Sequence, residues 1–119
     1  MRPRVVTLLI LALSCTPAVD KSVLTERARQ FFAAAARGDS AALVAMSVDS
    51  IPVHAALAAA KVDPNLFRIA ADSLTVERSS ESADTANFFF RIPRERIALG
   101  FVRRDTVWRV NHLGFPDRH

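Results

Sequence analysis

The chain has 119 residues, enough for one domain, and half of them are hydrophobic, which excludes an intrinsically disordered protein. The formal net charge is +4 at pH 7, from 16 basic and 12 acidic residues. Because the arginines are scattered along the chain, this excess is a weak argument for nucleic-acid binding, and we predict no nucleic-acid partner. The single cysteine, Cys15, excludes an internal disulfide.

The N-terminus has the pattern of an export signal. Arg2 and Arg4 form a positive region ahead of the apolar run 5–13, which only Thr7 interrupts. That run is shorter than the ~20 residues that a membrane-spanning helix needs, but it suits the apolar region of a signal peptide. The sequence therefore predicts a protein that is exported.

The end of this run resembles the lipobox of bacterial lipoproteins, in which a small residue, here Ser14, precedes the cysteine that is lipidated, here Cys15. The alternative is an ordinary secretory signal cleaved after Ala18. We predict lipidation at Cys15, which would become the mature N-terminus. The predicted divisions of the chain are a lipoprotein signal peptide at 1–14, a tether at 15–21, a single α+β domain at 22–115 and a tail at 116–119.

The first predicted element of the domain is an amphipathic helix over residues 24–37. At about 100° per residue, one face collects its apolar side chains: Leu24, Ala28, Phe31, Phe32 and Ala35. Asp20 or Ser22 can cap its start, and Gly38 supplies the left-handed position that ends it. Shorter helices are predicted over residues 41–46, 53–61 and 65–71, with Leu57 as the apolar anchor of the second.

From residue 74 the apolar residues recur with a period of two, which predicts strands. Turns at 81–83, 93–96 and 104–105 connect the strands into a curved, four-stranded antiparallel meander. The registers that these turns imply give two rows on one face: Val76–Phe88–Phe101–Trp108 and Leu74–Phe90–Leu99–Val110. That face is the natural partner of the first helix, so the predicted fold class is α+β, with N-terminal helices packed on the sheet.

The opposite face of the predicted sheet carries Phe89, Val102 and Val107 among polar residues, with Phe89 opposite Gly100. An aromatic ring over a strand glycine is a packing device within one chain. Apolar residues ringed by polar ones are also a common interface layout. We predict a weak homodimer through these three apolar residues.

A resemblance to a known superfamily rests on the two ends of the domain. The first helix ends in Gly38-Asp39, and the meander ends in Trp108-Arg109-Val110. This pattern is similar to the nuclear transport factor 2-like (cystatin-like α+β) superfamily, above all to its small bacterial lipoproteins of unknown function. The resemblance implies a sheet that wraps the first helix as a cone, often with a pocket at the open end. Some relatives catalyse isomerisation or dehydration there with Asp and His, and many bind a ligand or a partner.

The candidate catalytic residues are His112, Asp72 and Asp49. In the predicted register, His112 extends the core face opposite Ile97, and Asp72 falls on the corresponding row at the other edge strand, so the two could act as acid and base. Asp49 could line the pocket, as the resemblance implies, or cap a helix. For all three residues we favour a structural role over a catalytic one. Because no CxxC, HExxH, GxSxG, P-loop or GxGxxG motif is present, we predict no cofactor and no metal site.

Two classes of function remain. The favoured one is a non-catalytic binding or interaction module of the bacterial cell envelope, held at the membrane by its N-terminal lipid and facing the periplasm or the exterior, with a small apolar molecule as its ligand. The alternative is a small cone-pocket enzyme of the isomerase or dehydratase kind that uses Asp and His. The two differ in whether a carboxylate or an imidazole faces an enclosed pocket.

Overall fold

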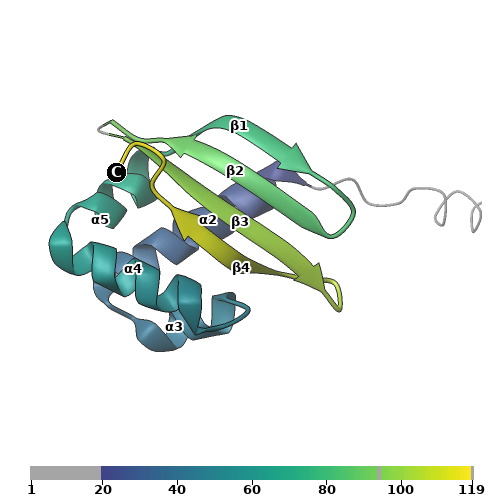
Figure 1. Ribbon diagram of the computed structural model, residues 1–119, viewed down its shortest axis with the longest axis horizontal. Coiled ribbons are helices and arrows are strands. Elements are labelled where there is room, and N and C mark those ends of the chain that lie inside the picture. Colours follow the sequence, from purple (N-terminus) through teal and green to yellow (C-terminus); the bar gives the residue numbers. More distant parts are fainter. Residues whose placement is uncertain (1–19, 94, 119) are drawn as a thin grey trace, which may run out of the picture.

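The computed structural model describes residues 20–93 and 95–118. Within these residues the chain forms four helices followed by a four-stranded antiparallel sheet in the order β1-β2-β3-β4 (Figure 1). The elements are α2 (Lys21–Arg37), α3 (Ser40–Met46), α4 (Ser50–Val62), α5 (Leu66–Ser73), β1 (Thr75–Glu81), β2 (Thr85–Arg91), β3 (Arg96–Arg104) and β4 (Val107–Gly114). The predicted α+β class and the meander are confirmed.

Polar residues and one glycine set the ends of the helices. The Asp20 carboxylate accepts hydrogen bonds from the backbone N–H groups of Ser22 and Val23, so α2 begins three residues earlier than predicted. Gly38 ends α2 at φ 67°, a left-handed conformation that glycine adopts without steric cost. Asp39 then caps α3 in the same way as Asp20 caps α2. The chain therefore reverses direction between α2 and α3 within two residues.

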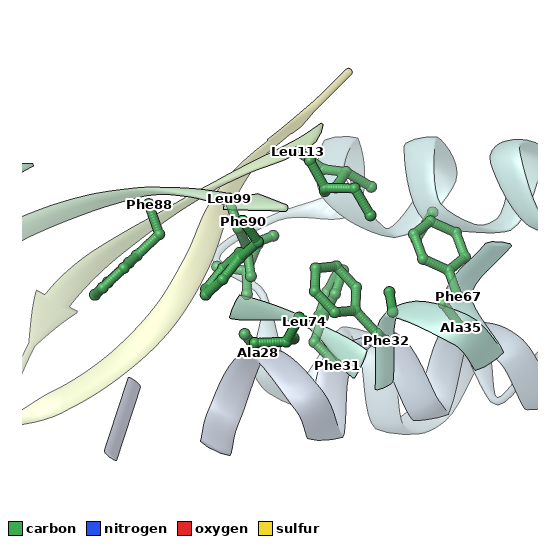
Figure 2. Packing of buried hydrophobic residues seen from close by; sticks show 14 of the residues in the cluster. Ala28, Phe31, Phe32, Ala35, Phe67, Leu74, Phe88, Phe90, Leu99 and Leu113 are labelled. Atoms are coloured by element: carbon green, nitrogen blue, oxygen red, sulfur yellow. The ribbon is translucent and has the colours of Figure 1, made fainter. Parts of the chain in front are cut away.

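Phenylalanine rings fill the space between α2 and the sheet (Figure 2). Phe32 stacks on Phe67 of α5 with ring centroids 5.6 Å apart, and meets Phe90 of β2 edge-on at 6.1 Å. Phe88 stacks on Phe90 at 5.4 Å and meets Phe101 of β3 edge-on at 5.9 Å. All five side chains are fully buried. One continuous set of ring contacts thus joins the first helix, the last helix and the two central strands.

Leu57, the predicted apolar anchor of α4, is partly buried and packs against the core, but it is not among the fully buried residues of that helix. The buried face of α4 is made instead by smaller side chains: Pro52, Val53, Ala56 and Ala59. Small residues let a helix approach its neighbours closely, and a larger leucine then projects at the margin of the contact.

The strand pairings differ from the predicted registers because two hairpins close differently. Phe90 pairs with Ile97 rather than Leu99, since the backbone N–H of Ile92 donates to the carbonyl of Glu95 and closes the loop one residue earlier. In the first hairpin, Val76 pairs with Phe90 and a bulge follows before Arg78. The predicted core faces of β2 and β3 survive because a shift of two residues preserves the alternation of side chains.

The third hairpin departs furthest from the prediction. Asp105 and Thr106 both have positive φ, 53° and 66°, so the two-residue turn lies there and not at 104–105. Phe101 consequently pairs with Val110. A bulge between Gly100 and Phe101 then leaves Asn111 as an extra residue on β4.

The bulge decides which side chains of β4 enter the core. His112 pairs with Gly100 and is exposed, and Leu113 pairs with Leu99 and is buried. The prediction that His112 extends the core face is therefore wrong, because one extra residue reverses the alternation of the strand after Val110.

Deleting Asn111 should be tolerated. The deletion would restore a regular ladder in which Val110, His112 and Leu113 keep their present partners, so the free energy of unfolding should change by about 1 kcal/mol or less. Deleting Asn87, which lies in a regular stretch of β2, should instead turn Phe88 and Phe90 away from the core or break the strand. Urea unfolding followed by circular dichroism compares the two deletions. An unfolded Asn111 deletion would contradict this account of the bulge.

Replacing Phe32 with alanine should cost ~3–5 kcal/mol, because it removes the ring that joins α5 to the sheet. Arg29→Ala is the matched control on the opposite face of α2. Its exposed ion pair with Glu26, at 3.8 Å, should be worth less than ~0.5 kcal/mol. Thermal and urea unfolding measure the stability of both variants. Equal losses of stability would show that the Phe32 ring contributes no more than the exposed Arg29 side chain.

The residues that follow β4 fold back onto the loop between β2 and β3. The Arg96 guanidinium donates to Asp117 Oδ1 at 2.7 Å, and its backbone N–H donates to Oδ2 of the same carboxylate at 3.0 Å. Arg118 binds Glu95 through two further hydrogen bonds. The Arg96 side chain, followed by its backbone N–H, holds the pKa of Asp117 below the ordinary value. Because the folded pKa is depressed, this contact is fully present at neutral pH and is lost as pH falls through the folded pKa.

An NMR titration should therefore find Asp117 with a pKa below the ordinary value of 3.8. Arg96→Gln should return the pKa toward 3.8, because it removes the charged donor. Arg118→Gln, which removes the ion pair with Glu95 and the contact with the Phe115 ring but leaves Arg96 in place, should leave the pKa of Asp117 depressed. An Asp117 pKa that does not respond to Arg96→Gln would refute the assigned cause.

Candidate binding surface

The sheet face turned away from the buried rings is the candidate surface, and we call it the outer face. Its strand pairs form three central rows: Arg78–Phe89–Ala98–Gly114, Ser80–Asn87–Gly100–His112 and Thr85–Val102–Arg109. A row at each end completes the face: Thr75–Arg91–Arg96 and Arg104–Val107. Between Ala98 and Val102, the outer face of β3 carries only small or medium side chains. Longer side chains lie beside this stretch on β2 and β4: Phe89, Asn87, His112 and Arg109. The outer face therefore has a low centre along β3.

A shallow hollow lies at one end of this low centre, and we call it the outer hollow. Its lining is mostly apolar: Phe89, Ala98, His112, Gly114, Phe115 and Pro116. A Cβ atom added to Gly114 would lie 3.0 Å from His112 Nε2, so the imidazole leans over this glycine. Arg78 lies over the Phe89 ring with its guanidinium carbon 4.5 Å from the ring centroid, and Arg118 lies over Phe115 at 4.6 Å. The outer hollow thus joins an apolar floor to charged rims.

Gly100 creates a second feature of the outer face. A Cβ atom at this position would lie 2.7 Å from Asn111 Oδ1 and 3.0 Å from Asn87 Oδ1. The glycine therefore allows side-chain amides from β4 and β2 to close over the centre of the sheet. Neither amide makes a side-chain hydrogen bond to another of the described residues, so both are available to a ligand.

The outer face is basic. Arg78, Arg104 and Arg109 are exposed, and none of them forms an ion pair within residues 20–93 and 95–118. The nearby carboxylate of Glu77 is already engaged, since Arg91 Nε donates to it at 2.6 Å and Arg96 lies 3.6 Å away. The hydrogen bond from Arg91 and the charges of Arg91 and Arg96 lower the pKa of Glu77. The three unpaired arginines therefore give the face its charge.

The three candidate catalytic residues lie on different parts of the molecule. His112 is on the outer face, and Asp72 is exposed in α5 rather than on an edge strand, so its predicted place in the sheet is wrong. Helix α5 extends to Ser73 because its apolar face, with Phe67 and Ala70, continues to pack on the core. Asp49 caps α4, with Oδ1 accepting from the backbone N–H of Ile51 at 2.9 Å. The structure does not bring these residues together.

A second hollow lies where the α3–α4 connection passes β4. It is lined by Val44, Ser47, Val48, Asp49, Ser50 and Arg109. Ser47 Oγ is buried and has no hydrogen-bond partner among the described residues. Ser47 forms a parallel bridge with the buried Val110, and paired residues point to the same face of a sheet. The pairing with Val110 places the Ser47 side chain on the core-facing side of β4.

The homodimer remains a prediction, but the apolar residues proposed for it are divided. Phe89 pairs with Ala98, not Gly100, while Val102 pairs with Thr85 and Arg109 two rows away. Val107 pairs with Arg104 in the row beyond. Sequence reasoning missed the low centre along β3, although the alternation Ala98-x-Gly100-x-Val102 was a readable signal. It also missed the partnership of Arg78 with Phe89, which depends on the bulge in β1.

The described residues form neither a metal-binding cluster nor a membrane-spanning helix. Residues 20–93 and 95–118 contain no group of three or more His, Cys, Asp or Glu side chains placed to hold a metal ion. No helix in the same residues is long and apolar enough to cross a bilayer. Cys15 and the apolar run before it lie outside the described residues.

The chain matches no family model, no curated protein and no solved structure.

Proposed function

We propose that the protein is an exported, lipid-anchored, non-catalytic binding or interaction module of the bacterial cell envelope. The observation that carries this proposal is the position of Cys15. It is the only cysteine, it closes an apolar run that follows two arginines, and it stands five residues before the Asp20 cap that begins the folded domain. A lipid on Cys15 would therefore hold the domain directly at a membrane surface.

The interior of the domain supports a binding role over catalysis. Aromatic rings occupy the space in which a cone-pocket enzyme would hold its substrate, and His112, Asp72 and Asp49 are all exposed. The outer hollow offers an apolar floor between Phe89 and Phe115, which suits contact with a small apolar ligand at the surface. The order of helices and meander is also compatible with the nuclear transport factor 2-like superfamily, which we retain as the proposed relationship.

Expression of the full chain in a bacterium tests the anchor. Membrane fractionation and mass spectrometry should find a protein that begins at Cys15 and carries the added mass of acyl chains. Cys15→Ser should abolish that mass and the membrane association that depends on it. A soluble parent protein that begins at Val19 would show instead that the signal is cleaved after Ala18 and would overturn the proposed anchor.

A further inference from the structure

We propose that the outer face of the sheet is the side that the anchored domain turns toward the membrane, where Arg78, Arg104 and Arg109 bind the phosphate groups of anionic phospholipids. This inference deepens the proposed function and rests on the anchoring at Cys15. It assigns a partner to a surface and an orientation to the domain.

The charge of the outer face is the first support. Arg78, Arg104 and Arg109 are exposed and have no carboxylate partner among the described residues. Two arginines of α2 do have carboxylate partners, since Arg29 lies 3.8 Å from Glu26 and Arg37 lies 3.4 Å from Asp39. The helices carry three further cations that form no ion pair among the described residues: Arg27, Lys61 and Arg68. The outer face thus presents three exposed arginines without a carboxylate partner on one surface of the sheet, where they complement an anionic surface.

The spacing of these cations suits a surface better than a single small anion. They lie on three different strands and in three different rows. With strands ~4.8 Å apart and residues of one face ~6.8 Å apart along a strand, Arg78 lies roughly 20 Å from each of the other two. A single phosphate cannot reach cations so far apart, whereas a bilayer presents headgroups across the whole span.

Arginine also has the right chemistry for this contact. Its planar guanidinium carries several N–H donors in a fork that fits phosphate oxygens. Arg78 lies over the Phe89 ring with its guanidinium carbon 4.5 Å from the ring centroid. Its guanidinium makes no hydrogen bond to another described residue, so its donors are available to phosphate oxygens.

The beginning of α2 lies beside an edge strand of the sheet. Lys21 lies 3.5 Å from Glu81 at the end of β1, so the helix starts beside an edge strand that also carries Arg78. The five residues from Cys15 to Asp20 can span at most roughly 17 Å. A tether this short makes contact between the domain and the lipid surface effectively intramolecular, so weak attraction is sufficient. Each arginine near an anionic surface favours the bound orientation by roughly five-fold.

The unique cysteine allows a direct test. A chain that begins at Cys15 retains every residue of the described core and can be coupled through its thiol to a maleimide lipid in vesicles. Arginine-specific modification with phenylglyoxal, read by mass spectrometry, then reports which side faces the lipid. On vesicles that contain phosphatidylglycerol, Arg78, Arg104 and Arg109 should react at least roughly five-fold more slowly than on phosphatidylcholine vesicles. Arg27 and Arg29, on α2, should react equally on both.

Paired substitutions separate the surface from the fold. Arg78→Gln with Arg109→Gln should abolish the protection of Arg104, and Arg27→Gln with Arg29→Gln should leave it intact. Circular dichroism confirms that each variant is folded. Protection should also fall as salt rises, because an exposed charge interaction is screened.

Three results would overturn the inference. The first is that Arg78, Arg104 and Arg109 react on both kinds of vesicle as fast as they do in the free protein. The second is that the α2 arginines are protected instead. The third is that the three arginines are protected equally on both kinds of vesicle. The last would indicate contact between copies of the chain rather than with lipid. Maleimide coupling replaces biological lipidation, so this experiment can be done whether or not cells lipidate Cys15. The absence of lipidation in cells would refute the proposed function, and the vesicle experiment would still test the orientation of the domain.

Discussion

The rest of the structure depends on the contact of Phe32 with Phe67 and Phe90. This contact is the point at which α2, α5 and the sheet meet, and no disulfide reinforces it. A domain of this size has a net stability of only ~5–15 kcal/mol. A cluster of stacked and edge-on rings therefore supplies much of what separates the folded from the unfolded chain. The rings also fill the space between α2 and the sheet, so the binding site proposed for this protein lies on its surface.

The surface, in turn, depends on local irregularities of the sheet. The bulge at Asn111 turns His112 outward and Leu113 inward, and the bulge after Val76 brings Arg78 beside Phe89. A regular sheet of the same sequence would present different side chains to solvent. The backbone irregularities thus determine the chemistry of the outer face, although they contribute nothing to the class of fold.

The sequence was sufficient to predict the parts of the fold that repeat. The period of 3.6 in α2, the period of two in the strands, and Gly38 at the helix end all follow from local rules, and the structure agrees with them. Single-residue events could not be predicted in this way. Nothing in the identity of Asn111 marks it as an extra residue, and Arg104-Asp105 is as plausible a turn by composition as Asp105-Thr106. The predicted position of the candidate site residue His112 was wrong for that reason. The exposed arginines could not be predicted as a binding surface, because the sequence does not show which carboxylates pair with which cations.

The short parallel bridge between Ser47 and Val110 affects how copies of the domain can meet. The backbone N–H of Val48 donates to the carbonyl of Val110 at 2.9 Å, so the α3–α4 connection occupies part of the outer edge of β4. A chain of sheets joined edge to edge needs two free edges on each molecule. Here the β4 edge is partly occupied, and the β1 edge is bent by a bulge and lined with charged residues. Copies of the domain at high local concentration therefore remain separate instead of growing into a continuous fibre.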